Sequence, residues 1–470
     1  MKARAIDPDG LYPQQRQAMT AMFKWFESND LEFTLGGYAG TGKTHVVSTF
    51  IKLIGKSANA CITAPTHKAL RVVEKQVGIK GKTLHSLHGL RMNVDLLNFD
   101  IENPQFDPMG TAHIQNFKLV IVDEASMVNS HLFNLNRKNA LLYKTKILYV
   151  GDPLQLPPIE RNNPDVQKGK AFTDVSNFFY LTDIVRQSSD NDMLELFIML
   201  RDDIMNRTNN CITHLVRARD KKVGKNYKVL SLNPYTETLL DYFNKEAFTK
   251  DIDYIRQACF SRAAVADWNH AIRHTIIKDD AELVNINDIF TAYANQIDDN
   301  KNPILRNSDD YILDDIDKYV NDVGISTFAV NLTNVSDHKM SPKLLILNHN
   351  DSTSVTTFLS LLNYLHYKAK YQGVPGGFRN YYKFKDSILI MKNLVLNESN
   401  KYKIVHKDID YGYALTIHKL QGSTMTNIAV DLYDIIYPKK GSSFVNNIDQ
   451  RNRLLYVALS RATDNAIIRY

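Results

Sequence analysis

Between Leu31 and about Leu200, short apolar segments alternate with amphipathic ones, and this alternation restricts the fold more than any other feature of the sequence. The apolar segments are four to six residues long, end at a polar residue or a glycine, and lie in LEFTLGG, ANACITAP, FKLVIVDEA and TKILYVGD. Strands that alternate with helices form parallel sheets, which bind ligands at the carboxyl ends of their strands. The pattern predicts an α/β fold.

The same pattern returns near the end of the chain. It weakens after Arg201, reappears in QACFSRAAVADWNHAIRH, and continues in YALTIHKLQGST, NIAVDLY and LLYVALSRATDNAIIRY. Residues 279–410 between these segments are first acidic and then rich in Tyr and Lys, with β-type runs at SILIMKNLVL. A chain of 470 residues is long enough for two or three domains. We therefore expect two βα bodies, a β-rich insert at 279–410, a short polar insert at 87–111, and no internal sequence repeat.

Composition excludes several classes of protein. Hydrophobic residues make up 44% and charged residues 23% of the chain, as in globular proteins. The start, MKARAIDPDG, has no apolar stretch like that of a secretory signal, and no apolar run approaches the roughly 20 residues that a membrane helix needs. Cys61, Cys211 and Cys259 are far apart in sequence, which predicts neither a disulfide framework nor a zinc site. We expect a cytoplasmic protein without a membrane partner.

Charge is unevenly distributed along the chain. Residues 279–322 contain twelve Asp and Glu against three Lys and Arg, a net charge of −9, whereas the whole chain carries +6 and the remainder therefore +15. A basic body of this kind can hold nucleic acid, with an acidic lobe outside it. The alternative is that the acidic stretch is only a solvated face.

The glycine-rich segment GGYAGTGKTHVV lies at residues 36–47, between an apolar strand and an amphipathic helix. It fits the phosphate-binding pattern G-x-x-x-x-G-K-[ST], and those flanks are the context that the pattern requires. In such a loop backbone N–H groups surround phosphate oxygens at a helix N-terminus. We expect ATP to bind here, with Lys43 at the β- and γ-phosphates and Thr44 holding Mg²⁺. The predicted nucleotide-binding residues of the loop are Gly37, Ala39, Gly40, Thr41, Gly42, Lys43 and Thr44.

An acidic pair follows the strand in KLVIVDEASM. Asp123 is predicted to position Mg²⁺, and Glu124 to orient or deprotonate the attacking water. An acidic pair after a strand is otherwise often a helix cap. Together with the glycine-rich loop, it favours a nucleoside triphosphate hydrolase.

Seven segments extend this interpretation to a family. They are APTHKA (64–69), TLHSLHG (83–89), VDEASM (122–127), GDPLQLPP (151–158), LTDIVRQ (181–187), TIHKLQGST (416–424) and LLYVALSRAT (454–463). In this order they resemble the motifs of superfamily 1 helicases, especially the RecD/Pif branch, and the size of the chain is similar to that of the Dda-type helicases of bacteriophages. The resemblance runs from about residue 11 to the C-terminus and is weak over 200–400.

The resemblance implies a role for further residues of the nucleotide site. Gln15 matches the glutamine that contacts adenine, although Tyr12 stands where the family usually has threonine, and Gln14 is a rival. Gln155 resembles the sensor between γ-phosphate and DNA, and Arg186 and Arg461 resemble the arginine fingers, a role that lysine fills poorly. Because Arg461 belongs to the second body, the ATP site would lie in the cleft between the two bodies.

The resemblance also implies a single-strand track on both bodies. Its predicted members are hydroxyl, imidazole and ammonium groups at strand-to-helix turns, which contact phosphates without reading sequence: Pro65, Thr66, His67, Thr83, His85, Thr416, His418 and Lys419. Any one of these residues could instead cap a loop. The insert at 87–111 would be a strand-separating β-hairpin with Phe99 or Phe106 at its tip. Phe106 is favoured because flanking prolines indicate a tight turn, and a small satellite core around either ring is the alternative.

These expectations combine into a domain plan and a function. The first RecA-like domain would comprise 1–86 and 112–200, with the pin insert at 87–111. The second would comprise 201–278 and 411–470, and the insert at 279–410 would resemble an SH3 barrel with an extended arm. We expect a monomeric, ATP- and Mg²⁺-dependent DNA helicase that moves 5′→3′ on single-stranded DNA, acts at single-strand/duplex junctions, and serves replication, recombination or repair with their proteins. The alternatives are an RNA or RNA–DNA helicase and a nucleotide-dependent DNA-binding or loading module without unwinding.

Overall fold

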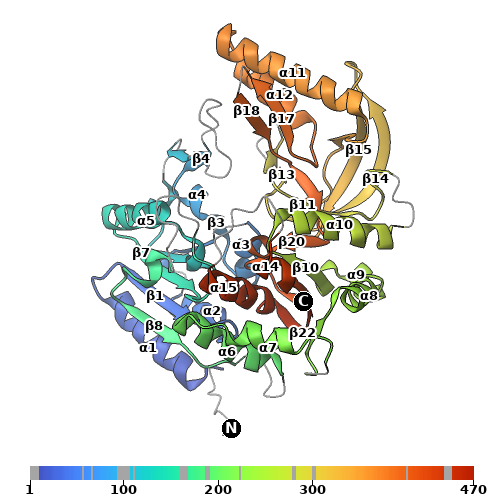
Figure 1. Ribbon diagram of the computed structural model, residues 1–470. Coiled ribbons are helices and arrows are strands. Elements are labelled where there is room, and N and C mark those ends of the chain that lie inside the picture. The colour runs from blue at the N-terminus through green and yellow to red at the C-terminus, as the bar shows by residue number, and fades with distance from the viewer. Residues whose placement is uncertain are drawn as a thin grey trace. The chain divides into compact units, whose positions relative to one another are not determined.

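The computed structural model describes residues 10–55, 58–64, 67–92, 106–108, 112–158, 168–185, 191–221, 224–277, 282–298, 303–398, 401–438 and 447–470. The chain divides into two compact units (Figure 1). Unit 1 consists of Met1–Val265 together with Thr416–Tyr470, and unit 2 is Ala266–Leu415. The two units are described separately.

Unit 1 contains a first sheet of six parallel strands in the order β3-β2-β6-β7-β1-β8. Because chain order and spatial order differ, the connections cross over the sheet through helices, as in other βαβ folds. The strands are β1 (Glu32–Gly37), β2 (Ala60–Ala64), β3 (Gly81–Thr83), β6 (Leu119–Val122), β7 (Lys146–Gly151) and β8 (Phe178–Leu181). The helices are α1 (Pro13–Glu27), α2 (Lys43–Ile54), α3 (His67–Val77), α4 (Leu84–Leu87) and α5 (Ser130–Tyr143).

This first sheet is buried on both faces, which explains the continuous apolar runs in its strands. On β7, Leu148 and Val150 pack into one core cluster with residues of α1, α2 and α3, such as Trp25. Ile147 and Tyr149 alternate with them and pack into the opposite cluster with residues of α4 and α5. The alternation follows from the two-residue period of a strand. It leaves the carboxyl ends of the strands open for the polar residues that follow them.

A second parallel sheet in unit 1 contains strands from the middle and from the C-terminal part of the sequence (Figure 1). Four neighbouring strands lie in the order β10-β21-β22-β9: β10 (Ile255–Cys259), β21 (Met425–Asp431), β22 (Ala462–Arg469) and β9 (Tyr227–Leu230). Its helices are α6 (Met193–Asn206), α7 (Asn210–Arg217), α8 (Leu232–Phe243), α9 (Glu246–Lys250), α13 (Ile417–Leu420), α14 (Leu432–Ile436) and α15 (Ile448–Leu459). Helix α10 (Arg262–Ile276) and strand β20 (Ala414–Thr416) cross the boundary between the units.

Unit 2 is built on an antiparallel sheet in the order β16-β15-β14-β11-β19. Its strands are β11 (Ile289–Ala292), β14 (Asp310–Val320), β15 (Ser326–Asn334), β16 (Leu344–Leu347) and β19 (Ile409–Tyr411). Two short ladders join β12 (Gln296–Ile297) to β13 (Pro303–Leu305) and β17 (Leu394–Glu398) to β18 (Lys401–Val405). A hairpin of two helices, α11 (Ser352–Tyr371) and α12 (Gly377–Ser387), lies between β16 and β17 in the sequence (Figure 1).

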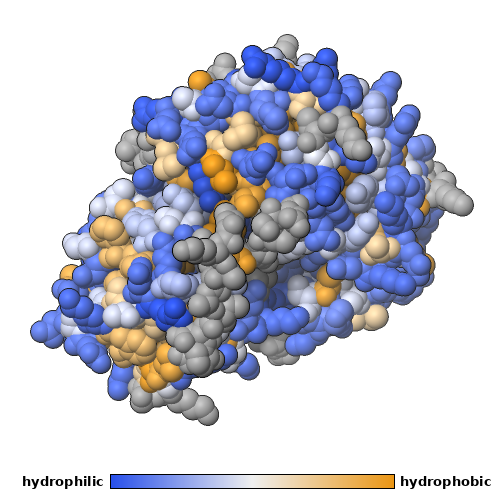
Figure 2. Space-filling view, turned by 90° about the horizontal axis from the view of Figure 1, so that it is seen from below, coloured by the Kyte–Doolittle hydropathy of each residue, from blue (hydrophilic) through white to orange (hydrophobic). Residues whose placement is uncertain are grey.

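The architecture confirms the α/β prediction with two parallel sheets and a β-rich insert. No helix among the described residues is long and apolar enough to cross a membrane. The face shown in Figure 2 is mostly hydrophilic, with small hydrophobic patches between the charged residues. The finer division into four domains stays a prediction.

Candidate functional site

The glycine-rich loop joins the end of β1 to the start of α2. Gly40 and Gly42 adopt φ angles of +80° and +82°, which glycine adopts more readily than residues with a side chain. A Cβ on Gly42 would also lie 2.4 Å from Nε2 of Gln15. Both the backbone path and the space around it therefore require glycine at position 42, and the loop opens helix α2 as the sequence predicted.

Lys43 lies where several charged groups converge. Its ammonium donates hydrogen bonds to the carbonyl oxygens of Gly37 (2.7 Å) and Tyr38 (3.0 Å). Burial lowers the pKa of Lys43, while the carboxylates of Asp152, Glu124 and Asp123 act in the opposite direction. Thr44, the next residue of α2, is partly buried. The loop thus places a partly buried cation near three carboxylates.

The acidic pair follows β6 at its carboxyl end. The backbone N–H of Asp123 donates to the carbonyl of Thr63 at 2.8 Å, which continues the β2–β6 pairing by one residue. Burial and, second, the charge of the neighbouring Glu124 raise the pKa of Asp123 to about 7, although Lys43 acts in the opposite direction. Glu124 itself has a φ of +49°, a left-handed backbone conformation that is uncommon for a residue with a side chain. Two neighbouring carboxyl groups, of which Asp123 has a raised pKa, would each be favoured in the ionised form by a bound cation.

The side chain of Gln15 contacts the glycine-rich loop. Its Nε2 donates to the carbonyl of Thr41 at 3.0 Å, its Oε1 accepts from the backbone N–H of Tyr12 at 3.0 Å, and its side chain is buried. Gln14 instead donates to Thr182 Oγ1 at 2.8 Å and accepts from two backbone N–H groups at 182 and 183. Both amides are therefore engaged with protein, and Gln15 is the one that contacts the glycine-rich loop.

Helix α15 from the second sheet docks onto the first body through two side chains on one face. Tyr456 donates a hydrogen bond to Asp152 Oδ2 at 2.7 Å. The backbone N–H of Ala39 in the glycine-rich loop donates to both groups, at 3.1 Å to the Tyr456 hydroxyl and at 2.9 Å to Asp152 Oδ2. Arg453, one turn earlier, donates to the carbonyls of Pro153 (3.1 Å) and Gln155 (3.0 Å). Tyr456 and Asp152 have no exposed surface. Residues of both bodies thus meet directly at the loop.

Gln155 makes a second connection between the bodies. Its Oε1 accepts from Nε2 of Gln421 at 3.0 Å, and Gln421 also donates to Ser126 Oγ at 3.4 Å, just after the acidic pair. The next residue, Gly422, has a φ of +81°, and a Cβ there would lie 3.8 Å from Glu124 Oε1. The segment TIHKLQG therefore reaches both the predicted sensor and the predicted water-orienting carboxylate.

Arg461 is buried directly after α15. Its guanidinium donates to the carbonyls of Val457 (3.1 Å) and Ser423 (3.2 Å) and to Ser460 Oγ (2.9 Å). Its charge also lowers the pKa of Lys43, which means that the two cations are close enough to repel. An anion between them would relieve that repulsion. Arg186, the other predicted finger, lies outside the described residues.

The predicted strand contacts include two turns of the same construction, one after each parallel sheet. Thr83 caps α4 by accepting from the N–H of Ser86, and Thr416 caps α13 by accepting from the N–H of Lys419, both at 3.3 Å. The sequences of the two turns are TLHSL and TIHKL, which share Thr, His and Leu at the same positions. Burial lowers the pKa of both histidines, His85 and His418, to about 4, which keeps them neutral at pH 7.

The structure describes only one of the three remaining predicted strand contacts. His67 begins α3, whereas Pro65 and Thr66 lie outside the described residues. No group of three or more His, Cys, Asp or Glu side chains suited to a metal ion occurs in the part of the chain that the structure describes.

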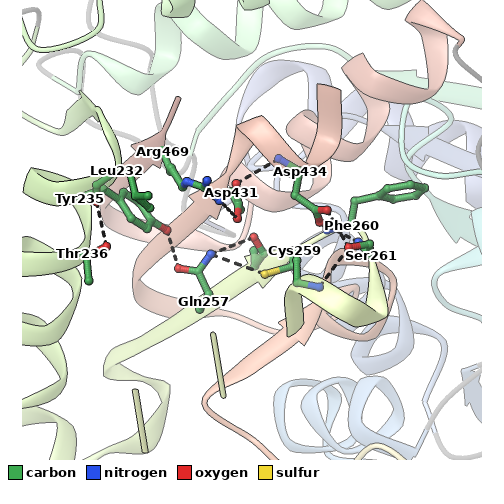
Figure 3. A network of polar contacts seen from close by, with 12 residues as sticks. Leu232, Tyr235, Thr236, Gln257, Cys259, Phe260, Ser261, Asp431, Asp434 and Arg469 are labelled. Atoms are coloured by element: carbon green, nitrogen blue, oxygen red, sulfur yellow. Dashed lines mark hydrogen bonds and ion pairs between the residues drawn. The ribbon is translucent and has the colours of Figure 1, made fainter. Parts of the chain in front are cut away.

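A polar network in the second body holds an aromatic side chain that the sequence reasoning missed (Figure 3). Asp434 accepts from the backbone N–H groups of Phe260 (2.8 Å) and Ser261 (2.7 Å) and from Ser261 Oγ (2.6 Å). These bonds fix the turn after β10, so that the ring of Phe260 lies 6.3 Å from that of His418. Tyr456, Asp152 and Asp434 were missed as well, although GDPLQLPP and LLYVALSRAT contain the first two.

The short insert contains a hairpin, and one expectation about it is wrong. Strands β4 (Leu90–Met92) and β5 (Phe106–Pro108) pair antiparallel, with Met92 opposite Phe106. Phe106 therefore lies in the ladder and not in the tight turn that its flanking prolines indicated. Phe99 lies outside the described residues.

Comparisons with known proteins agree with this geometry. Residues 10–214 match the family model of an AAA domain. An uncharacterised protein of Acanthamoeba polyphaga mimivirus is 24% identical over 92% of this chain and 94% of its own length. The ATP-dependent DNA helicase Dda of Enterobacteria phage T4 is also 24% identical, over 59% of this chain and 60% of its own length. The ATP-dependent DNA helicase Pif1 of Campylobacter jejuni is 29% identical over 31% of this chain and 33% of its own length.

Solved structures match the whole fold. The Pif1 helicase from Bacteroides in complex with ADP-AlF3 and single-stranded DNA has a TM-score of 0.51 at 17% identity, covering 96% of this chain and 91% of its own. A Pif1 structure concerned with unwinding at forked duplex DNA has a TM-score of 0.53 at 15% identity, covering 97% of this chain and 92% of its own. The phosphate-binding loop, the acidic pair and the seven ordered segments resemble those of superfamily 1 helicases of the RecD/Pif branch. The chain is accordingly similar in sequence to the DNA helicases Dda and Pif1, and in fold to Pif1 helicases.

Proposed function

We propose that the protein is an ATP-dependent DNA helicase that moves 5′→3′ along single-stranded DNA and opens duplex ahead of it. The observation that carries the proposal is the meeting of Lys43, three carboxylates and Arg461 at a loop to which both parallel sheets contribute residues. A site made of two bodies changes when they move relative to each other, so hydrolysis there can be coupled to motion.

Each residue of the site has a proposed role in hydrolysis. Lys43 would leave its two loop carbonyls for the β- and γ-phosphates, and the loop N–H groups from Ala39 to Thr44 would bind the remaining oxygens. Glu124 would orient the attacking water, and Arg461, with Arg186, would stabilise charge on the transferring phosphoryl group. Gln155 would report the state of the γ-phosphate through Gln421. Gln15 would contact adenine while it supports the loop.

The donor set also fits Mg²⁺. Carboxylate and hydroxyl oxygens are the ligands that this ion prefers, and Asp123 and Thr44 would supply them. Burial, followed by the charge of Glu124, raises the pKa of Asp123, so a bound cation would favour its ionised form. When bound, the ion would neutralise charge on the β- and γ-phosphates.

Strand binding is proposed for the matching turns on both sheets. Thr83 and His85 on one body, and Thr416, His418 and Lys419 on the other, would contact the phosphate backbone together with Pro65, Thr66 and His67. Neutral imidazoles donate hydrogen bonds without adding charge, which suits contacts that must be released at every step. The related Bacteroides Pif1 structure contains single-stranded DNA. We propose single-stranded DNA and single-strand/duplex junctions as partners, and a monomer in the cytoplasm as the working form.

A strand-displacement assay with 5′-tailed and 3′-tailed duplexes, with and without ATP, tests the proposal. Only the 5′-tailed duplex should open, only with ATP, and less efficiently as salt rises, because the contacts are to phosphates. Lys43→Ala should abolish opening and hydrolysis while single-strand affinity stays within a few-fold. Preferential opening of the 3′-tailed duplex would reverse the polarity.

Two other outcomes would favour the alternatives. Tight DNA binding and DNA-stimulated hydrolysis without any strand displacement would indicate a loading module. Preference for RNA in competition experiments would indicate an RNA helicase, since the 2′-OH is recognised locally.

A further inference from the structure

Helix α11 in unit 2 exposes a row of aromatic side chains. Tyr364, Tyr367 and Tyr371 are 52%, 52% and 60% exposed. Their spacing of three and four residues places them on one face of the helix, and we call them the tyrosine stripe. The outer face of a solvated helix is ordinarily polar or charged, so three large rings on it need an explanation.

The stripe is not needed for packing. The opposite face of α11 supplies the buried residues of the helical hairpin: Ser354, Phe358, Leu362, His366 and Ala369. Phe358 packs on Phe384 of α12 with ring centroids 5.4 Å apart, and a Cβ on Gly377 would lie 3.0 Å from that of Ala369. The inner faces therefore supply these close contacts between the two helices.

Positive charge accompanies the stripe. Lys368 Nζ lies 4.5 Å from the ring centroid of Tyr364, and Lys370 Nζ lies 5.0 Å from that of Tyr371. Residues 352–387 contain five Lys and Arg against one acidic residue, Asp386. Asp386 pairs with Lys385 at 3.3 Å, which leaves Lys368, Lys370, Arg379 and Lys383 to determine the charge of the hairpin. The preceding stretch of the same unit, 279–322, carries −9.

We infer that the tyrosine stripe and its lysines form a second binding surface for single-stranded nucleic acid, separate from the track on the parallel sheets. Aromatic rings stack on unpaired bases of any sequence, and neighbouring ammonium groups contact the phosphates. A duplex offers its phosphates but hides the faces of its bases, so the rings favour a single strand. The inference rests on the proposed function only for the nature of the partner.

The test measures equilibrium binding of the full chain, without nucleotide, to oligothymidylates of about 8 and about 30 nucleotides, lengths within and beyond one ordinary binding groove. The triple variant Tyr364→Ala/Tyr367→Ala/Tyr371→Ala should bind the long oligonucleotide about 10- to 30-fold more weakly and the short one as the parent does. Oligouridylates of the same lengths reveal whether the surface distinguishes DNA from RNA.

Three further variants separate stacking from charge and from damage to the fold. Replacing the same tyrosines by Phe keeps the rings and should preserve affinity. Lys368→Ala/Lys370→Ala should reduce the slope of log affinity against log salt by about 1.4, since each single-strand phosphate contact contributes roughly 0.7. The matched control is Tyr319→Ala/Val320→Ala/Val323→Ala, three exposed side chains in the acidic part of the same unit, which should change neither quantity.

Parental affinity of the alanine triple variant for the long oligonucleotide would overturn the inference. Self-association of the parent in sedimentation experiments, if the triple variant abolishes it, would also overturn the inference. The stripe would then join two copies of the chain. Failure of the proposed function is measured separately, in the strand-displacement assay, where the parent would open neither tailed duplex whatever its affinity for the two oligonucleotides.

Discussion

The hydroxyl of Tyr456 donates a 2.7 Å hydrogen bond to Asp152 across 304 residues of sequence. Both groups are fully buried, and both also meet the N–H of Ala39 in the glycine-rich loop. Tyr456 lies in α15 five residues before Arg461, so we infer that this bond helps to position the proposed finger arginine relative to the loop. We regard Tyr456 as a positioning residue for hydrolysis.

Tyr456→Phe removes one oxygen atom from this contact. It leaves Asp152 with one partner fewer in a buried place, which costs on the order of 1–3 kcal/mol. Separately from this cost in stability, loss of the contact that positions Arg461 is expected to lower kcat for ATP hydrolysis roughly tenfold, which corresponds to about 1.4 kcal/mol of activation free energy. KM should stay within about threefold. Steady-state kinetics and thermal melting measure both effects.

Tyr149→Phe is the matched control for this change. Tyr149 is also fully buried and donates to a carboxylate, Glu32, but at the opposite end of the first sheet. It should lower the melting temperature without lowering kcat. A similar loss of kcat in both variants would mean that Tyr456 acts only through stability.

Arg461→Lys should separate binding of ATP from its hydrolysis. A lysine keeps the charge but lacks the planar fork of donors, and finger arginines contribute about 10³–10⁵ in rate in related enzymes. We expect nearly normal ATP affinity and loss of most turnover. The comparison is Arg469→Lys, which should retain turnover. Arg469 forms an ion pair with Asp431 at 2.7 Å in the second parallel sheet. Equal losses of affinity and turnover in Arg461→Lys would assign Arg461 a structural role.

Asp123→Asn should stabilise the nucleotide-free protein at alkaline pH. Burial raises the folded-state pKa of Asp123 to about 7, above its value of 3.8 in an unfolded chain. The protonated group therefore contributes stability that is fully present below about pH 4 and is lost as the pH rises through 7. An asparagine mimics the protonated form at every pH. We expect a melting temperature about 2–4 °C above the parent's at pH 8, and no difference near pH 4.

The same variant should also lose ATP hydrolysis, because the proposed cation ligand is gone. Asp241→Asn, at an exposed carboxylate paired with Lys245, should change neither property. A lower melting temperature of Asp123→Asn at pH 8 would show that the carboxylate is compensated within the protein.

Phe99→Ala should uncouple hydrolysis from unwinding. Since Phe106 pairs with Met92 inside the β4–β5 ladder, Phe99 is the remaining phenylalanine of the insert. Loss of one base stack costs about 1–3 kcal/mol, enough to let the fork close again. We expect unchanged DNA-stimulated ATPase and a strong loss of strand displacement. Phe106→Ala is the comparison, and normal unwinding by both variants would exclude the insert as a separation pin.

The sequence predicted what depends on a few neighbouring residues. The glycine-rich loop, the acidic pair after β6 and the motif segments lie at strand ends, where chain order alone sets the geometry. The Tyr456–Asp152 bond depends on how α15 docks onto another sheet, and no local pattern contains that information. The prolines around Phe106 were misleading because pairing with Met92 overrides the turn preference of short peptides.

The two threonine-capped turns, TLHSL and TIHKL, have a consequence for movement. If both turns contact the phosphate backbone of the strand with the same groups, neither turn binds more tightly than the other. The contacts alone would then allow the strand to move in either direction. Directional movement would then have to come from timing, that is, from which of the two turns releases the strand while ATP is bound. Gln421, one residue beyond TIHKL, donates to Gln155, the proposed γ-phosphate sensor, and so connects the second turn to the proposed nucleotide site. The direction of movement would then depend on how each turn is connected to the proposed nucleotide site, and not on the contacts that the turns make with the strand.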